Sequence, residues 1–578
     1  MAFDIGTTYS GASYAVLDPG FVPEIHGVTR FPAQQRVGGD SKIPTIIFYD
    51  QEGAVRAVGA EATQDSFLEE AGDEDYVKVE WFKLHLRPRS LPSTHIREED
   101  IPPLPENKTG EEILADFLGY LFRSTRLYIQ ESHPGGVAFW QSVEQNIDYV
   151  LSLPNGWEGA QQAQMRRSAV RAGLVASEAE ALKRISFVTE GEASLHFCVQ
   201  KGVTRGAIEP GEGIIIVDCG GGTIDVSAYV CKAHNSFEEV APPQCHLEGS
   251  VFVSRRARIH LMQKLQGSRY RDDVDHMTNI FDRSTKLSFR NPASPAFIRF
   301  GTARDKDLTV DIKSGQMKLS GDDIVKMFKP SVEAIMNAIE EQRLQTTTPI
   351  KAVFLVGGFA ASDYLFNQVV EQLQPQGLQV TRPDGHLNKA VADGAVSFYL
   401  DHFVSVRVAN FTYGMECLTS FDPSNPDHVA RSGKTIFRPS GRIVIPEYFD
   451  VILKKGIRVS EETEFKRSYH VESSVPIKSR TEDILCYRGR KEDPKWVDLE
   501  PYMFSPVCTV VADTSSIPES ETTQQSLDGM RYYRKEFDII LLFGMTELKA
   551  QIAWKESGGV EKRSPAIIVY DSLVEAGA

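Results

Sequence analysis

Two short stretches of similar composition, DIGTTYSG at residues 4–11 and DCGGGTIDVS at residues 218–227, decide how this chain is interpreted. In each, an acidic residue is followed by glycine and then by threonine. Glycine lets the backbone approach an anion, successive N–H groups in a tight turn form a cradle, and threonine hydroxyls add donors. An ordinary β-hairpin turn uses the same residues, so one stretch alone does not separate a turn from a site. Two such stretches predict phosphate-binding loops on duplicated halves of one nucleotide-binding domain.

The acid that begins each stretch follows a short hydrophobic run, where a carboxylate beside a phosphate loop would hold Mg²⁺. Mg²⁺ prefers oxygen ligands and dehydrates reluctantly, so we expect Asp4 and Asp218 to act through water. The chain has no GxxxxGK[ST] sequence, and neither glycine turn has the GxGxxG spacing. A P-loop and a dinucleotide-binding fold are therefore excluded.

A third stretch, FLVGGFAASDYL at residues 354–365, is a hydrophobic strand that delivers two glycines to the start of a helix. Close backbone approach at Gly357 and Gly358 would suit the flat face of an adenosine. A strand that ends in two glycines is common, so this stretch supports a nucleotide site only together with the two turns.

Up to about residue 400, short β-branched runs alternate with helical patterns, which is typical of an α/β fold with a mostly parallel sheet. Strands are predicted at 149–154, 214–219 and 351–358. Helix starts are predicted at Thr109 and Ser320, each followed three residues later by an acid, as in a capping box. In the first of these helices we expect Ile113, Phe117, Leu121 and Leu127 to face the core.

After about residue 404 the helical patterns nearly vanish, and strand-like runs separated by Gly, Pro, Asp and Ser follow. We expect a boundary near 400–405 and a β-rich C-terminal domain at 404–578. The Pro- and charge-rich residues 86–108 are predicted to form an exposed loop.

The composition narrows the class of protein. The chain has 578 residues, 41% of them hydrophobic, and 63 basic against 79 acidic side chains give a net charge of −16. This balance argues against a nucleic-acid or anionic-membrane partner. The seven cysteines are scattered and form no CxxC pair, so neither a disulfide framework nor a zinc site is indicated. With no apolar run long enough to span a membrane, a cytoplasmic protein is expected.

Three stretches, FDIGTTYS (3–10), IIIVDCGGGTIDVSAY (214–229) and VFLVGGFAAS (353–362), occur in this order and together resemble the 70-kDa heat-shock (DnaK-like) chaperones of the actin-like ATPase superfamily. The resemblance covers about residues 1–400. It implies a ribonuclease-H-like α/β domain at 1–403, with lobe I at about 1–210 and lobe II at about 211–403. It also implies ATP or ADP with Mg²⁺ as cofactors, slow hydrolysis, and a nucleotide-driven change in shape.

The resemblance assigns roles by position. Residues expected to contact the phosphates are Gly6, Thr7, Thr8 and Tyr9 from one side and Gly220, Gly221, Gly222 and Thr223 from the other. Asp4, Asp218 and Asp225 would order hydrated Mg²⁺ and the attacking water, and Thr223 would also take part in catalysis. Glu190, in FVTEGEASLHF (187–197), aligns with the family's catalytic glutamate, with Glu192 as a rival; Lys83 matches its phosphate-facing lysine.

The sequence also departs from the family. Typical members follow the third motif's glycines with a serine or threonine and a nearby arginine that packs on the base, whereas Phe359 stands here and is expected to stack instead. On the opposite wall, Asp282 and Lys286 in FDRSTKLSF (281–289) match only loosely. No helical lid is expected, which indicates a divergent branch of the family.

Three functions therefore remain open. The first is a chaperone-like ATPase whose nucleotide state modulates a C-terminal module that takes an extended polypeptide or another protein. The second is a nucleotide-dependent scaffold with little or no hydrolysis. The third, a sugar-type kinase, would need a catalytic acid in a substrate cleft, and no motif for one is found.

Overall fold

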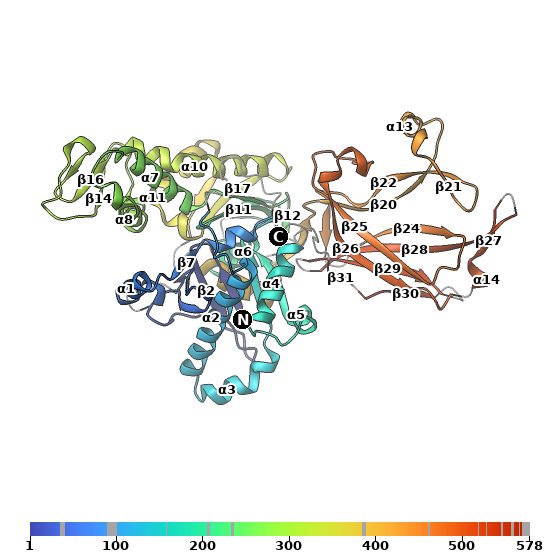
Figure 1. Cartoon of the computed structure of the whole chain (residues 1–578), viewed down its shortest axis with the longest axis horizontal. Coiled ribbons are helices and arrows are strands. Elements are labelled where there is room, and N and C mark those ends of the chain that lie inside the picture. The colour runs from blue at the N-terminus through green and yellow to red at the C-terminus, as the bar shows by residue number, and fades with distance from the viewer. Residues whose placement is uncertain are drawn as a thin grey trace. The chain divides into compact units, whose positions relative to one another are not determined.

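The N-terminal part of the chain is built around two sheets with the same succession of strand directions (Figure 1). The first runs β3-β2-β1-β8-β9, and the second contains β18-β17-β10-β11-β12. In each, an antiparallel hairpin, β1–β2 or β10–β11, is extended by two parallel strands. The expectation of a mostly parallel sheet is therefore wrong, because β2 and β11 pair antiparallel with all their neighbours, and only the strands beyond β1 and β10 are parallel. A tight turn can join only antiparallel neighbours.

The strands of the first sheet are β1 (Ala2–Ile5), β2 (Tyr9–Tyr14), β3 (His26–Gly27), β4 (Ile43–Pro44), β8 (Tyr149–Leu153) and β9 (Ile185–Thr189). Those of the second are β10 (Gly213–Cys219), β11 (Ile224–Cys231), β12 (Phe237–Glu239), β13 (Gln244–His246), β17 (Ile350–Val356) and β18 (Gln379–Thr381). The three predicted strands correspond to β8, β10 and β17 and are confirmed.

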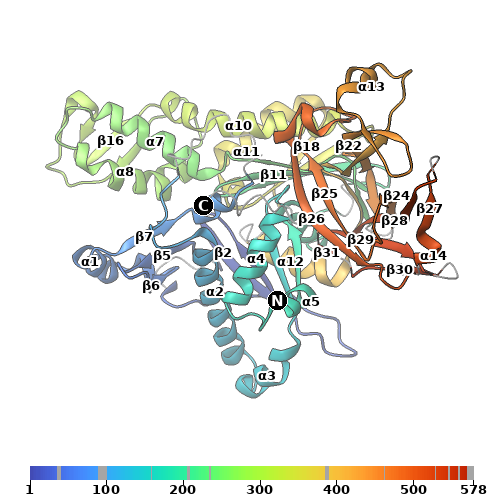
Figure 2. The same cartoon turned by 45° about the vertical axis from the view of Figure 1, so that its right-hand side comes forward.

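Around the first sheet lie α2 (Gly110–Ser132), α3 (Gly136–Val143), α4 (Ala160–Arg171), α5 (Glu178–Arg184) and α6 (Glu190–Gln200). A small sheet of β5 (Ile46–Tyr49), β6 (Val55–Val58) and β7 (Val77–Glu80) lies beside α1 (Asp65–Asp73) in both views (Figure 2). The capping box at Thr109 is confirmed, because its side chain accepts from the Glu112 N–H while Glu112 accepts from the Thr109 N–H. Leu127 is half exposed, contrary to expectation, because the buried stripe continues through Ser124 and Thr125.

The second sheet is covered by α7 (Ser250–Lys264), α8 (Val274–Ile280), α9 (Lys286–Ser288), α10 (Gly321–Leu344) and α11 (Asp363–Leu373), with a small sheet of β14 (Ala296–Arg299), β15 (Ile312–Lys313) and β16 (Gln316–Leu319). The predicted start of α10 is confirmed, since Ser320 Oγ accepts from the Asp323 N–H at 3.1 Å. Apolar side chains from β10, β11, α7 and α10 form the core on this side.

Helices α6 and α12 (Ala390–Asp401) cross closely between the two sheets. A Cβ on Gly394 would lie 1.8 Å from the Ala193 carbonyl oxygen, so only glycine permits this crossing. Because Glu190 is the first residue of α6, the crossing also fixes the position of the expected catalytic glutamate.

The chain divides into two compact units, Met1–Trp157 with Gln164–Val404, and Ser405–Ala578 with Glu158–Ala163. The second contains a sheet in the order β21-β22-β20-β25-β26 and another with the order β24-β28-β29-β30. Their strands are β20 (Thr412–Ser420), β21 (Ile436–Phe437), β22 (Ile443–Leu453), β24 (Glu464–Ser473), β25 (Ser479–Tyr487), β26 (Phe504–Asp513), β27 (Thr523–Gln525), β28 (Arg531–Gly544), β29 (Glu547–Lys555), β30 (Glu561–Arg563) and β31 (Ile567–Ile568). The strands β19 (Val404–Val408) and β23 (Arg458–Ser460) pair antiparallel with each other. The helices α13 (Pro426–Ala430) and α14 (Glu519–Thr522) are short.

This computed structural model describes residues 1–34, 41–88, 101–157, 159–204, 208–232, 236–383, 389–460, 463–517, 519–526, 529–544, 547–556, 560–565 and 567–568. Most of the predicted loop at 86–108 lies outside these residues. Within them, no helix combines the length and apolar character needed to cross a membrane.

Candidate functional site

The two glycine turns predicted from the sequence face each other within the N-terminal unit. One joins β1 to β2 and the other joins β10 to β11, so both are hairpin turns. A Cβ on Gly221 would lie 2.2 Å from Thr8 Oγ1, and one on Gly222 would lie 2.4 Å from Thr7 Oγ1. Turns from two separate sheets therefore meet at a contact that only glycine allows.

Backbone N–H groups on both turns have no hydrogen-bond partner among the residues that the structure describes: those of Gly6, Thr7, Thr8, Gly221 and Gly222. The carbonyls of the second turn are used differently, because Gly220, Gly221 and Gly222 accept from the first N–H groups of α7 and its preceding glycine. Thr7 and Thr223 are buried beside these turns. Free amide groups next to hydroxyls are the elements of an anion-binding cradle.

Two lysines, the buried Lys83 and the partly exposed Lys42, lie beside this cradle, each paired with a carboxylate that the sequence singled out. Lys83 Nζ donates to Glu190 Oε1 at 2.5 Å, and both side chains are at least nine-tenths buried. Lys42 Nζ donates to Asp4 Oδ2 at 2.5 Å. The structure thus brings Asp4, Lys83 and Glu190 together as expected, and it adds a lysine that the sequence reasoning missed.

Two further carboxylates from the second sheet complete the cluster. Asp218 accepts from Ser194 Oγ at 2.8 Å, and Asp225 Oδ1 accepts from the Asn155 N–H at 2.6 Å. Asn155 follows β8 of the first sheet, so this bond joins the two halves. A Cβ on Gly357 would lie 2.3 Å from Asp218 Oδ1, which places the third motif against the same carboxylate.

Burial and mutual repulsion shift the acidities of this cluster. Burial, with Glu190 and Asp4 nearby, raises the pKa of Asp218 from 3.8 to about 7. Burial likewise raises the pKa of Asp225, with Glu190 adding to the effect, and it raises that of Glu190 despite the neighbouring Lys83 ammonium. Burial alone would lower the pKa of Lys83, but Glu190 and Asp4 outweigh it and raise it. Asp218, Asp225 and Glu190 therefore gain protons more readily than ordinary carboxyls, and a bound cation would replace those protons.

The donor set fits a hard cation held through water. In the described ranges, no cluster of three or more His, Cys, Asp or Glu is arranged to ligate a metal directly. Asp225 Oδ2 is buried with no hydrogen-bond partner in those ranges, and Asp4 and Asp218 offer further carboxylate oxygens. An orphaned buried carboxylate oxygen is costly, so a hydrated Mg²⁺ would relieve it.

The expected base-binding wall is only partly realised. Gly357 adopts a left-handed φ of 84° and leads into a short turn of 3₁₀ helix at Gly358–Ala361. The Phe359 ring, however, is 5% exposed within the core and lies 6.0 Å from the Phe328 ring. The prediction that Phe359 stacks on a base is therefore wrong, because the turn directs this side chain into the core.

Opposite this turn, Asp282 lies in a single π-helical turn, Phe281–Thr285, and Lys286 follows it. Lys286 is buried, and its ammonium donates to Asp282 Oδ1, Ser254 Oγ and the Ser250 carbonyl, so its three donors are used internally. Burial would raise the pKa of Asp282, but Lys286 and Ser254 keep it below its ordinary value. Lys286 therefore acts as a scaffold, whereas half of the Asp282 side chain stays exposed.

Two residues near this region, Arg290 and Trp157, were not indicated by any sequence motif. Arg290 pairs with Asp363 at 2.8 Å, which joins the segment after α9 to the start of α11. Trp157 is fully buried, with Lys83 Nζ 5.7 Å from its ring centroid. Tyr9, in contrast, is nearly half exposed at the start of β2.

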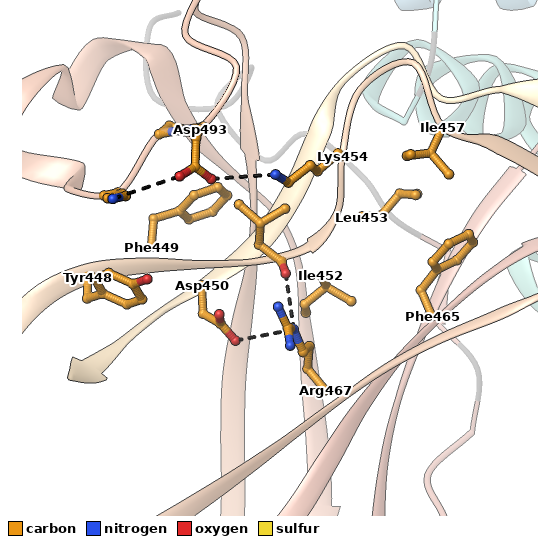
Figure 3. A pocket seen from close by; sticks show the side chains of 13 residues that line it. Tyr448, Phe449, Asp450, Ile452, Leu453, Lys454, Ile457, Phe465, Arg467 and Asp493 are labelled. Atoms are coloured by element: carbon orange, nitrogen blue, oxygen red, sulfur yellow. Dashed lines mark hydrogen bonds and ion pairs between the residues drawn. The ribbon is translucent and has the colours of Figure 1, made fainter. Parts of the chain in front are cut away.

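The C-terminal unit has a separate pocket of about 330 Å³ beside β22 and β24 (Figure 3). Along the outer edge of β22, the Phe449 N–H donates to the Lys495 carbonyl and the Val451 carbonyl accepts from Arg467 Nε. Lys454, Lys495 and Arg467 face Asp450 and Asp493 at the mouth, so cations outnumber acids by one.

No family model matches the chain. Human heat shock 70 kDa protein 12B is 22% identical over 639 aligned positions that cover 95% of this chain and 88% of that protein. Heat shock 70 kDa protein 12A of mouse and of human are 23% and 24% identical, each covering 73% of this chain and 72% of the relative. These relatives imply an actin-like ATPase fold. The resemblance to the 70-kDa heat-shock protein family, first indicated by three short motifs, is thereby confirmed for this chain as a divergent relative.

Proposed function

We propose that the N-terminal unit is a two-lobed actin-like ATPase domain, at about 1–403, that binds ATP with Mg²⁺ and hydrolyses it slowly. The observation that carries this proposal is the meeting of two glycine turns with free amides beside a cluster of buried carboxylates. The matching strand directions of the two sheets support lobes at about 1–210 and 211–403.

Each residue then has a definite task. The free amides of both turns and the hydroxyls of Thr7, Thr8 and Thr223 would bind phosphate oxygens. Mg²⁺ would neutralise phosphate charge, held through water by Asp4 and Asp218. Phosphoryl transfer needs mainly positioning and charge neutralisation, so a carboxylate that orients water is sufficient.

Glu190 is our candidate for that carboxylate. Its raised pKa suits it to accept a proton from an attacking water, and Lys83 fixes its orientation through the ion pair. Glu192, its rival, is also buried, but Glu190 is the residue that forms the ion pair with Lys83.

Nucleotide binding and single-turnover hydrolysis test this proposal. We expect wild type to bind Mg-ATP, and Glu190→Gln to bind it within a few-fold while hydrolysis falls about 100-fold or more. Glu192→Gln is the matched control and should retain the wild-type rate. Equal rates for wild type and Glu190→Gln would support the scaffold, stimulation by a sugar would support the kinase, and failure to bind any nucleotide would refute all three.

For the C-terminal unit, at about 404–578, we propose a chaperone-like role in which an extended polypeptide adds to the part of β22 that continues beyond its pairing with β21 at Ile443 and Val444. An edge strand offers backbone groups to such a chain, and the pocket's excess of cations favours acidic side chains. Val451 presents its carbonyl outward, where Arg467 now caps it.

Proline at an edge position keeps the fold but removes one outward donor. We therefore expect Val451→Pro to weaken binding of a labelled acidic, extended peptide, measured by fluorescence anisotropy. The same substitution at Val511, an exposed position in β26, is the control. Equal peptide affinity in Val451→Pro and wild type would place the polypeptide elsewhere.

A further inference from the structure

Lys42 reaches the candidate site from the position directly before the short strand β4, in a segment that carries no recognisable motif. The strand β4 pairs with the start of β2, where Ile43 lies opposite Ser10. The Thr45 N–H donates to the Thr8 carbonyl at 2.8 Å, and the Thr45 and Ser10 hydroxyls bond at 2.8 Å. These contacts fix the segment that carries Lys42 directly against the first glycine turn.

Gly11, the last residue of the first motif, makes room for the Lys42 side chain. It lies opposite Asp4 in the β1–β2 hairpin. A Cβ on Gly11 would lie 3.1 Å from Lys42 Cγ, closer than most Cβ atoms approach a neighbour, and 3.7 Å from its Cε, an ordinary contact distance. With glycine here, the lysine stem passes over the hairpin and its ammonium reaches Asp4, and 14% of the Lys42 side chain remains exposed.

Both oxygens of Asp4 are already engaged in this arrangement. Oδ2 accepts from Lys42 Nζ, and Oδ1 accepts from Ser152 Oγ at 3.1 Å. Lys42 also acts electrostatically on Glu190 and Asp218, whose pKa values it lowers against the larger effect of burial. Lys42 is thus the cation of the carboxylate cluster on the Asp4 side, while Lys83 is held by Glu190.

A phosphate that enters the cradle changes this balance. The amides of the first turn belong to the same hairpin as Asp4. A phosphate bound by these amides therefore comes within reach of the Lys42 ammonium, which sits at the end of a long, flexible side chain. A lysine can exchange one oxygen partner for another at little cost, because its three donors are not fixed in a plane. An ammonium that bridges Asp4 and phosphate supplies charge that would otherwise have to come from a divalent cation.

We propose that Lys42 is a phosphate-binding residue of this site and that it makes nucleotide binding less dependent on divalent cation. This inference rests on the proposed nucleotide-binding function. It concerns equilibrium affinity, so it can be tested without hydrolysis.

The test is a thermodynamic cycle of nucleotide affinity, with and without Mg²⁺. Dissociation constants for ATP are measured by calorimetry for wild type and Lys42→Met, each in Mg²⁺ and in EDTA. One charge-assisted hydrogen bond corresponds to about a 10- to 100-fold change in affinity. We expect Lys42→Met to lose at least about tenfold in EDTA and clearly less in Mg²⁺.

Lys329→Met, which removes an exposed lysine of α10, is the matched control and should change neither constant. Gly11→Ala keeps Lys42 but displaces the carbon chain of its side chain, so it should also weaken ATP binding in EDTA. This variant replaces Lys42→Met in the test if Lys42→Met does not fold. If wild type binds no ATP in Mg²⁺, the proposed function fails. The role of Lys42 is refuted if wild type binds ATP and the ratio of its affinities in Mg²⁺ and in EDTA is the same in Lys42→Met. It is also refuted if Lys42→Met binds ATP more tightly than wild type.

Discussion

Replacing Asp218 with asparagine should stabilise the nucleotide-free protein, although it removes a residue of the candidate site. The Asp218 carboxyl is 3% exposed, and its pKa is raised from 3.8 to about 7 by burial and by neighbouring carboxylates. A carboxyl whose folded-state pKa is raised adds stability that is fully present below its unfolded-state pKa. That stability is lost as the pH rises through the folded-state value.

The size of the pKa shift of Asp218 determines the expected change in stability. About three pKa units correspond to a cost of about 4 kcal/mol once the folded-state carboxylate is ionised, and about 2 kcal/mol of it is already present at pH 5.5. Asparagine carries no charge and can still accept from Ser194 Oγ, so it avoids this cost. For a unit of roughly 400 residues, about 4 kcal/mol raises Tm by about 5 °C.

Thermal unfolding of the nucleotide-free protein in EDTA, at pH 8.5 and pH 5.5, measures this effect. We expect Asp218→Asn to raise Tm at pH 8.5 and to raise it about half as much at pH 5.5. Asp18→Asn, on an exposed loop, is the matched control and should change Tm at neither pH. A lower Tm for Asp218→Asn at pH 8.5, or a gain that does not shrink at pH 5.5, would refute the assigned environment of this carboxyl.

Three further substitutions test other parts of the site. Gly222→Ala should weaken ATP binding about tenfold or more by forcing the two turns apart, whereas Gly72→Ala, with no atom near its Cβ, should not change the Kd. Phe359→Ala should lower the free energy of unfolding by about 3–5 kcal/mol in chemical denaturation without changing the ratio of ATP to GTP affinity, because its ring lies in the core. Arg290→Ala breaks an exposed pair with Asp363 and should cost less than about 1 kcal/mol of stability; an accompanying several-fold loss of ATP affinity would identify Arg290 as the arginine that packs on the base.

Local signals in the sequence predicted the elements well wherever the physics is local. The helix N-caps at Thr109 and Ser320 need only the residue three positions later, and both are present in the structure, at Thr109 as a full capping box. The strand β10, which carries Asp218, was recognisable because a fully buried strand is a nearly continuous apolar run. The prediction that Leu127 faces the core was wrong for the opposite reason. Which side of a helix is buried at a given turn depends on where the elements packed against that helix end.

In the candidate site, too, local sequence signals identified some residues, whereas a residue placed by distant elements was missed. Repetition of the glycine turns indicated that Thr7, Thr8, Gly221 and Gly222 belong together, because a short motif also defines its own backbone geometry. Lys42 could not be found in this way. Its place depends on the pairing of β4 with β2 and on the gap above Gly11, and neither is encoded in the residues next to it.

The charges of the cluster suggest why binding and conformation would be coupled in such a site. Four buried carboxylates face two lysines, so these side chains together carry an excess of negative charge that burial makes costly. Asp4 and Glu190 belong to the first half of the unit, and Asp218 and Asp225 to the second. Protons would offset this repulsion, and a hydrated Mg²⁺ shared by carboxylates of both halves would offset it only while the halves stay together. A ligand shifts a conformational equilibrium only by its difference in affinity for the two states, and this charge distribution supplies such a difference at the place where the two glycine turns meet.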